Sequence, residues 1–218
     1  MKKDFWLERW EREEIGFHQN EINPYLREYW PLLHSAEGGE VFVPLCGKSL
    51  DMLWLKQQGC PVLGVELSSV AVEAFFTENG LQANHVSSPN FNACEADSIR
   101  ILCGDFFDLT KDQLSKVKTV YDRASLVALP PEVRERYVRH LIEILPSKSQ
   151  ILLVTFDYHQ AEMPGPPFAV SIDEVNLLFR DYAEVTLLAG LDVLSQNPRF
   201  IARGLSRMHE NIFLITLS

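Results

Sequence analysis

The stretch from Glu40 to Ser49, EVFVPLCGKS, limits the possible folds of this chain more than any other. An apolar strand runs into a turn at Gly47, an amphipathic segment follows, and a second apolar strand, residues 62–66, ends on an acid. This order predicts a strand–helix–strand unit of a parallel sheet. The carboxyl ends of such strands form a crevice, where an acid can accept both hydroxyl groups of a ribose. Glu66 is therefore a candidate nucleoside-binding residue.

The turn at Gly47 lacks the other glycines of phosphate-binding loops. Gly47-Lys48-Ser49 ends like such a loop, but that motif needs a glycine five positions earlier, where this chain has Phe42. The dinucleotide motif needs three spaced glycines, so a loop with one glycine suits a nucleoside without phosphates. An ordinary strand-to-helix turn with a solvated Glu66 explains this stretch equally well.

Length and charge exclude several classes of protein. The 218 residues, 46% of them hydrophobic, can fill a sizeable core, and we expect one domain over residues 1–218. No apolar run approaches the roughly 20 residues of a membrane span, and the first residues lack the apolar core of a signal peptide, so we expect a cytoplasmic protein without a membrane partner. The net charge of -10, spread without a basic block, disfavours nucleic acid as a partner.

The cysteines and histidines show no metal-ligand spacing. The four cysteines form no C-x-x-C pair and the six histidines no H-E-x-x-H motif, which predicts reduced thiols and no metal site. Cys60 and Cys103 lie in or beside apolar strands, which favours small buried side chains. We expect no histidine to be catalytic.

The N-terminal segment is rich in aromatic residues. Residues 1–35 are predicted to contain two helices that form a cover over the site. Trp6 and Trp30 are expected in the core. Trp10 and Phe17 lie in a segment that precedes the first strand, and such segments can close over the crevice of a nucleotide-binding sheet.

The rest of the chain alternates strands with helices, which predicts an α/β fold. After the first two strands, further strands are expected at residues 98–103, 118–122, 150–156, 183–188 and 210–217. Asp105 and Arg123 follow the third and fourth strands, on the same edge as Gly47 and Glu66. Residues 84–97 are polar and are interpreted as a surface excursion.

Four motifs closely resemble the thiopurine S-methyltransferase family, in its short bacterial form. They are FVPLCGKSLDMLWL (42–55), GVELS (64–68), YDRASLVAL (121–129) and PGPPF (164–168), and the likeness covers nearly the whole chain. The resemblance implies a Rossmann-like, seven-stranded methyltransferase sheet, mostly parallel with an antiparallel last strand and with helices on both faces. It also implies S-adenosyl-L-methionine as cofactor and methyl transfer to aromatic or heterocyclic thiols, and in bacteria also to selenium or tellurium compounds.

The resemblance also assigns roles to residues. Those implied to bind the cofactor are Trp10, Leu45, Gly47, Glu66, Asp105, Phe106 and Arg123. Phe17, Pro167 and Phe168 would line the acceptor site. Arg123 and Arg199 would be catalytic, with Arg203 as the alternative to Arg199.

These residues suit methyl transfer. A sulfonium methyl is already activated, so the protein must mainly align the acceptor sulfur and exclude water, and an arginine can stabilise a thiolate or order a water that accepts the proton. A base N-methyltransferase is a weaker reading, because the motif at 165–168 follows the fifth strand and lacks the amide or acid of that class. A non-catalytic domain that binds a nucleoside as a sensor is a third interpretation. A small thiol acceptor and a monomer are expected.

Overall fold

The structure is a computed structural model that describes residues 3–33 and 39–218. The chain divides into two compact units, the first running up to Tyr121 and including residues 144–146, and the second comprising Asp122–Glu143 and Ser147–Ser218. Within the expected N-terminal cover of residues 1–35, positions 1–2 and 34–35 lie outside the described residues.

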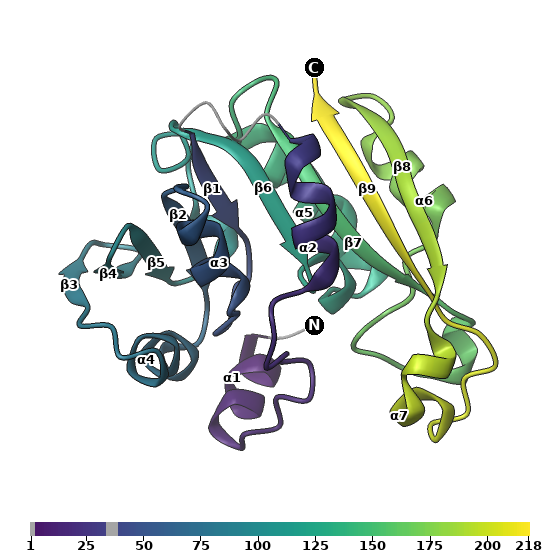
Figure 1. The fold of residues 1–218 in the computed structure, drawn as a ribbon. Coiled ribbons are helices and arrows are strands. Elements are labelled where there is room, and N and C mark those ends of the chain that lie inside the picture. Colours follow the sequence, from purple (N-terminus) through teal and green to yellow (C-terminus); the bar gives the residue numbers. More distant parts are fainter. Residues whose placement is uncertain (1–2, 34–38) are drawn as a thin grey trace. The chain divides into compact units, whose positions relative to one another are not determined.

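The first unit is a sheet with helices packed on it (Figure 1). Its helices are α1 (Lys3–Glu11), α2 (Pro24–Tyr29), α3 (Asp51–Gln57) and α4 (Ser69–Glu78). Its strands are β1 (Glu40–Val43), β2 (Val62–Glu66), β3 (Asn84–Ser87), β4 (Asn92–Ala96) and β5 (Ile99–Cys103), and β6 (Val117–Arg123) ends where the second unit begins. The strand order is β3-β4-β5-β2-β1-β6, with β5, β2, β1 and β6 parallel.

Strand β2 lies in the middle of this parallel set. All five of its residues are buried, as a strand covered on both faces requires, and its neighbours are β1 and β5. Helix α4 then begins at Ser68, whose Oγ accepts the N–H of Ala71 at 3.3 Å. Glu66 is thus placed at the carboxyl end of a fixed strand, two residues before a helix.

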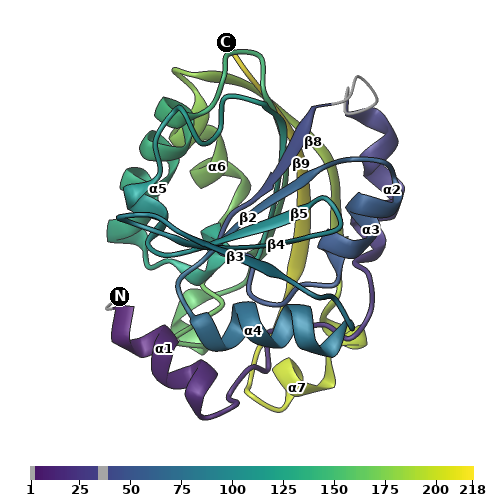
Figure 2. The same ribbon diagram turned by 90° about the vertical axis from the view of Figure 1, so that its left-hand side faces the viewer.

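Residues 84–97 form a β-hairpin, which was not predicted, although its first strand lies at the surface as expected. Strands β3 and β4 pair antiparallel with each other, and β4 pairs antiparallel with β5 (Figure 2). All four residues of β3 are exposed, so the hairpin has no alternating apolar pattern that could predict it. The seven expected strands are all present, and this hairpin brings the number of strands in the described residues to nine.

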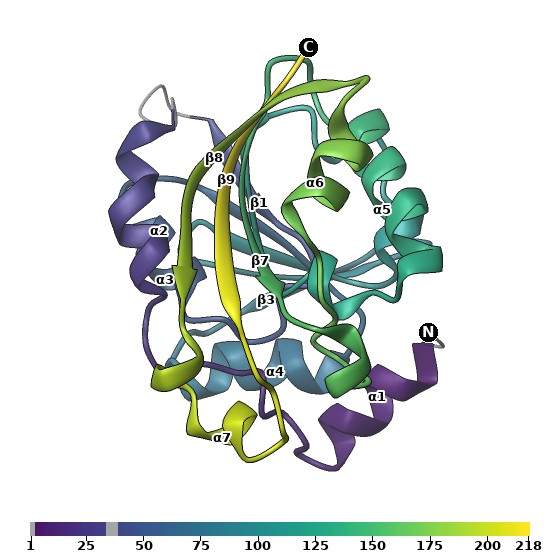
Figure 3. The same ribbon diagram turned by 90° about the vertical axis from the view of Figure 1, so that its right-hand side faces the viewer.

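The second unit contains three antiparallel strands with two helices on one side (Figure 3). Its elements are the 3-10 helix Leu126–Ala128, α5 (Pro131–Ile144), β7 (Gln150–Asp157), the 3-10 helix Gln160–Glu162, α6 (Ile172–Phe179), β8 (Ala183–Asp192), the 3-10 helix Leu194–Gln196, α7 (Pro198–Ile201) and β9 (His209–Leu217). The order is β7-β9-β8, with a register shift between Leu187 and Ala189 in the outermost strand, β8.

A small separate core joins two loops of the second unit. It consists of Tyr158, Met163, Val193, Phe200, Leu205 and Met208. These residues come from the loop after β7 and from the connection between β8 and β9. The connection folds around Phe200 and carries α7. The two loops therefore form one packed body.

Within residues 3–33 and 39–218, no helix combines the length and the apolar character needed to cross a membrane. All four cysteines are free, and Cys60 is buried whereas Cys103 is partly exposed.

Candidate active site

Glu66 is a buried carboxylate held by backbone donors of the first unit. It is 6% exposed, its Oε2 accepts the N–H of Gly47 at 2.9 Å, and its Oε1 accepts the N–H of Ser68 at 2.8 Å. Burial raises the pKa of Glu66, and these backbone hydrogen bonds oppose the rise. A carboxylate has about four lone-pair sites, so each oxygen can still accept a hydroxyl group. The solvated alternative for Glu66 is therefore wrong.

The loop after β1 is shaped by two residues with left-handed backbone. Leu45 has a φ of 44° and Gly47 a φ of 53°. A Cβ atom on Gly47 would lie 3.0 Å from Cζ2 of Trp10, so this position needs glycine both for its backbone and for its contact. The N–H of Cys46 donates to the carbonyl of Val65 at 3.0 Å and fixes the loop to β2.

Trp10 and Phe17 lie together over this loop. Trp10 is 5% exposed, and its ring meets the ring of Phe17 edge to face, with centroids 5.6 Å apart. Trp6 also meets the ring of Phe17 edge to face, with a centroid distance of 5.5 Å. Helix α1, which carries both tryptophans, lies beside α4 (Figure 2). The structure thus brings together Trp10, Phe17 and Gly47, three of the expected site residues.

Asp105 and Phe106 follow β5 at the same sheet edge as Glu66. Asp105 Oδ1 accepts the N–H of Phe107 at 2.9 Å, and its other oxygen lies 2.5 Å from Nζ of Lys3. Phe106 is 3% exposed and stacks on Phe42 with a centroid distance of 6.5 Å. Phe106 is therefore buried beneath this edge of the sheet, whereas Asp105 faces α1. Sequence gave no signal for the ion pair with Lys3.

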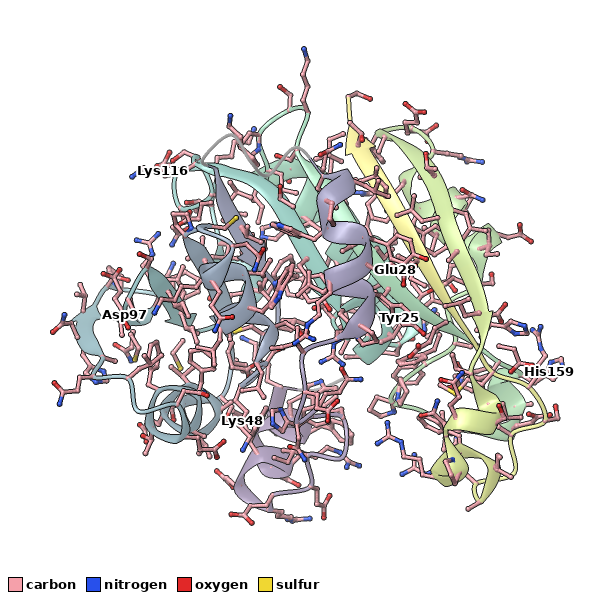
Figure 4. The ribbon with its side chains drawn as sticks, in the orientation of Figure 1. Tyr25, Glu28, Lys48, Asp97, Lys116 and His159 are labelled. Atoms are coloured by element: carbon pink, nitrogen blue, oxygen red, sulfur yellow. The ribbon has the colours of Figure 1, made fainter. Side chains whose placement is uncertain are left out.

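Lys48 provides a second ion pair close to the Gly47 loop. Its Nζ lies 2.7 Å from Oε1 of Glu78, and Figure 4 shows Lys48 beside α4. Asp51, at the start of α3, is 1% exposed and accepts the N–H of Asn23 at 2.8 Å and the hydroxyl of Tyr121 at 3.1 Å. No role for Asp51 was expected from sequence, although it fastens the end of the N-terminal segment to the sheet.

Arg123 lies in the second unit, directly after the buried Asp122. Asp122 is 2% exposed, and its Oδ2 accepts the hydroxyl of Tyr137 at 2.7 Å. Successive side chains of a strand point to opposite faces, so Arg123 leaves β6 on the face opposite Tyr137. Ala124 then has a φ of 76°, which turns the chain sharply.

Pro167 and Phe168 belong to a loop that is fastened at several points. The N–H of Phe168 donates to the carbonyl of Val127 at 2.7 Å, and the hydroxyl of Tyr158 donates to the carbonyl of Pro167 at 2.6 Å. A Cβ atom on Gly165 would lie 2.6 Å from the ring of Phe168. The shape of the loop therefore depends on glycine at this position.

Arg134 supports the same loop and was not expected from sequence. Its side chain is 1% exposed, its Nη1 lies 2.6 Å from Oε1 of Glu174, and its Nε donates to the carbonyl of Leu129 at 2.9 Å. The guanidinium carbon lies 5.9 Å from the ring centroid of Phe168. The available signal was its spacing from Val138, four residues later, on the buried side of α5.

Arg199 and Arg203 both lie against Phe200. The guanidinium carbons are 4.8 Å and 5.9 Å from the ring centroid, respectively, and both arginines are exposed. Nη1 of Arg203 also lies 3.8 Å from Sδ of Met163, in the loop that leads to Pro167. Both arginines therefore remain candidates, and Arg203 also contacts the loop that leads to Pro167 and Phe168.

Among the residues that the structure describes, no group of three or more His, Cys, Asp or Glu side chains is arranged to hold a metal ion. His159, at the start of the loop after β7, is exposed (Figure 4).

Relatives at high sequence identity span the whole chain. A family profile described as Thiopurine S-methyltransferase (TPMT) matches residues 1–218. A thiopurine S-methyltransferase of Nitrosospira multiformis is 62% identical over 215 residues, covering 99% of this chain and 98% of the relative. One of Azotobacter vinelandii is 50% identical over 213 residues, covering 98% of each chain.

Solved structures share the fold at low sequence identity. The 1,6-didemethyltoxoflavin-N1-methyltransferase of Burkholderia thailandensis, with bound S-adenosylhomocysteine, has a TM-score of 0.63 and 14% identity, covering 99% of this chain and 87% of its own. An S-adenosylmethionine-dependent methyltransferase of Anabaena variabilis has the same TM-score and identity and covers 99% and 95%. The expected Rossmann-like methyltransferase fold is confirmed, and the chain belongs to the thiopurine S-methyltransferase family.

Proposed function

We propose that this protein transfers a methyl group from S-adenosyl-L-methionine to the sulfur of an aromatic or heterocyclic thiol. Its family membership supports the reaction, and relatives that align with almost its full length are named thiopurine S-methyltransferases. The observation that carries the cofactor assignment is the Glu66 carboxylate, buried at the end of β2 and fixed by two backbone N–H groups.

The residues of the first unit fit a nucleoside that lacks phosphates. Glu66 would accept the ribose hydroxyls, and Gly47 allows a ligand to approach the loop backbone closely. Trp10 would supply an aromatic face near the sulfonium, which a cation favours. Leu45 and Phe106 would line the cofactor pocket. Asp105 would contact the cofactor at the edge of this pocket after its ion pair with Lys3 opens.

S-adenosylmethionine, when bound, supplies a methyl group on a positively charged sulfur and leaves as S-adenosylhomocysteine. The protein's task is to align the thiol sulfur behind that methyl and to exclude water. Phe17, Pro167 and Phe168 would form the apolar walls of the acceptor site. Arg123 would stabilise the acceptor as a thiolate or order the water that takes its proton.

Arg199 would bind an anionic group of the acceptor, with Arg203 as the alternative. A guanidinium is always charged and presents two parallel donors to a carboxylate, which suits this role. Selenium or tellurium compounds are a second acceptor class for the same alignment chemistry, because a selenolate or telluride can replace the thiolate as nucleophile.

Transfer of a labelled methyl group tests the proposal. Purified protein is incubated with methyl-labelled S-adenosylmethionine and a panel of aromatic thiols, heterocyclic thiols, selenides and free nucleobases. Labelled thioether with an equal amount of S-adenosylhomocysteine is the expected result. Label on a nucleobase nitrogen would favour a base N-methyltransferase. Cofactor binding with no transfer to any member would favour a nucleoside sensor.

The proposal includes a monomer that acts in the cytoplasm on small molecules. Four free cysteines suit a reducing compartment, and the acidic net charge of -10 disfavours binding to nucleic acid. Light scattering at several protein concentrations tests the monomer, and a mass that grows with concentration would contradict it.

A further inference from the structure

A buried carboxylate organises the turn that follows Arg123. Asp122 Oδ2 accepts the hydroxyl of Tyr137 at 2.7 Å, and its Oδ1 accepts the N–H of Leu126 at 3.2 Å. Ser125 contributes further hydrogen bonds from its backbone and its side chain. Tyr137 is itself 1% exposed, on α5. One carboxylate thus connects the strand end, the turn and the helix that packs behind them.

The same turn is hydrogen-bonded to Phe168, which is proposed to line the acceptor site. The 3-10 helix Leu126–Ala128 has no capping bond from the side chain of Ser125 at its start, and Asp122 satisfies its first N–H instead. Within this helix, the carbonyl of Val127 accepts the N–H of Phe168 at 2.7 Å. The direction in which Arg123 leaves β6 and the place of Phe168 therefore depend on the same few hydrogen bonds.

A buried charge normally destabilises a fold. Removing a carboxylate from water costs several kcal/mol unless hydrogen bonds replace its hydration. Burial raises the pKa of Asp122, whereas its bonds to Tyr137, Leu126 and Ser125 oppose the rise. These bonds all converge on the turn after Arg123, and they hold Ala124 at a φ of 76°, which an alanine rarely adopts.

We propose that Asp122 and Tyr137 are positioning residues for methyl transfer, which act through Arg123 and Phe168. The inference rests on the proposed function, in which Arg123 and Phe168 contact the acceptor. The hydroxyl of Tyr137 fixes the rotamer of Asp122, and Asp122 fixes the turn. Loss of that hydroxyl should misplace the acceptor groups while the aromatic ring keeps its packing.

The test is a double-mutant cycle with Tyr137→Phe and Arg123→Ala, using thiophenol as acceptor. Tyr137→Phe should lower kcat/KM for thiophenol on the order of ten-fold, below the roughly hundred-fold that a 1 Å misplacement can cause. In the Arg123→Ala background the same change should cause a smaller loss than in the wild type, because only the effect through Phe168 remains. Additive losses, or wild-type kinetics of Tyr137→Phe, would overturn the inference.

A second readout does not depend on activity. Amide hydrogen exchange at residues 125–128 should accelerate in ligand-free Tyr137→Phe, because the Asp122 carboxylate no longer has a fixed rotamer. Unchanged exchange there would also overturn the inference. The affinity for S-adenosylhomocysteine, measured by calorimetry, should fall by a smaller factor than kcat/KM, because Arg123 is one of several residues assigned to the cofactor. An equal loss in both would overturn the inference.

Tyr121→Phe is the matched control. It also removes a buried hydroxyl that donates to a carboxylate, that of Asp51, at 3.1 Å. Both variants should shift the midpoint of urea unfolding similarly, but only Tyr137→Phe should speed exchange at residues 125–128. If Arg123→Ala alone keeps wild-type kinetics, the role of Arg123 in the proposed function fails. If Arg123→Ala is impaired and Tyr137→Phe is not, only the positioning role fails.

Discussion

Replacing Glu66 by Gln should separate cofactor binding from folding. The side chain keeps its size, but the carboxylate becomes an amide with one acceptor and one donor group. In the wild type both oxygens accept backbone N–H groups, from Gly47 at 2.9 Å and from Ser68 at 2.8 Å. In the variant one of these N–H groups must face the amide nitrogen. The same nitrogen can no longer accept a ribose hydroxyl.

Two opposing effects decide the change in folding stability. A buried N–H group without an acceptor costs about 1 to 3 kcal/mol. Against this, the variant no longer buries a charge, and burial is the main cause that raises the pKa of Glu66. The net change in unfolding free energy should stay within about 2 kcal/mol of zero. Binding has no such compensation, because a hydrogen bond to a charged group contributes about 1.5 to 3 kcal/mol, or roughly 10- to 150-fold in Kd.

Calorimetric titration with S-adenosylhomocysteine measures the affinity, and urea unfolding measures the stability of the same sample. Glu95→Gln is the matched control, because Glu95 also lies on a strand of the first unit but pairs with Arg100 at 3.6 Å on the surface. The control should keep the wild-type Kd. If folded Glu66→Gln also binds with the wild-type Kd, Glu66 only fastens the Gly47 loop and the cofactor assignment is refuted.

Four further predictions follow from the same contacts. Because burial raises the pKa of Glu66, this group holds its proton in the native state just above about pH 4, where it loses it in the unfolded state. The stability contributed by Glu66 should therefore fall as pH rises through that window, and the difference in urea unfolding between wild type and Glu66→Gln, measured across it, should show this fall. Amide hydrogens of residues 5–20 should exchange more slowly when S-adenosylhomocysteine is bound, since Trp10 gains a ligand contact. Equal rates with and without the ligand would mean that the aromatic residues of this segment are only core residues. Lys3→Ala should change the unfolding free energy by less than about 1 kcal/mol, because Lys3 is 62% exposed, and a larger loss in chemical unfolding would contradict this. Either Arg199→Ala or Arg203→Ala should lower kcat/KM more for a mercaptobenzoate than for thiophenol, and that variant identifies the arginine that binds the acceptor anion. If both variants keep the wild-type ratio of the two kcat/KM values, both arginines are excluded from this role.

The parallel part of the fold could be predicted because its signals are local. Strand β2 has no charged residue before Glu66 at its end, and all five of its residues are buried, so five consecutive residues carried the information. The order of strand, glycine turn and helix also placed Glu66 at the correct strand end. The β3–β4 hairpin could not be predicted in this way, because its first strand is exposed on both faces and shows neither the apolar alternation of a strand nor the apolar period of a helix.

The buried polar partners could not be predicted for a different reason. Asp51 and Tyr121 are 70 positions apart, and Arg134 and Glu174 are 40 positions apart, so each pair exists only after the chain has folded. A polar residue alone in sequence looks like a surface residue, and only its partner explains its burial. The pair of Lys3 and Asp105 escaped prediction for the same reason.

The register shift in β8 has a consequence for how copies of this protein behave when concentrated. An outermost strand of ten residues, with Leu187 and Leu191 exposed, would otherwise offer a long edge to another chain. The shift between Leu187 and Ala189 divides that edge into two short halves that are out of step. A second molecule that pairs with one half cannot continue along the other, so the irregularity protects the protein from edge-to-edge aggregation.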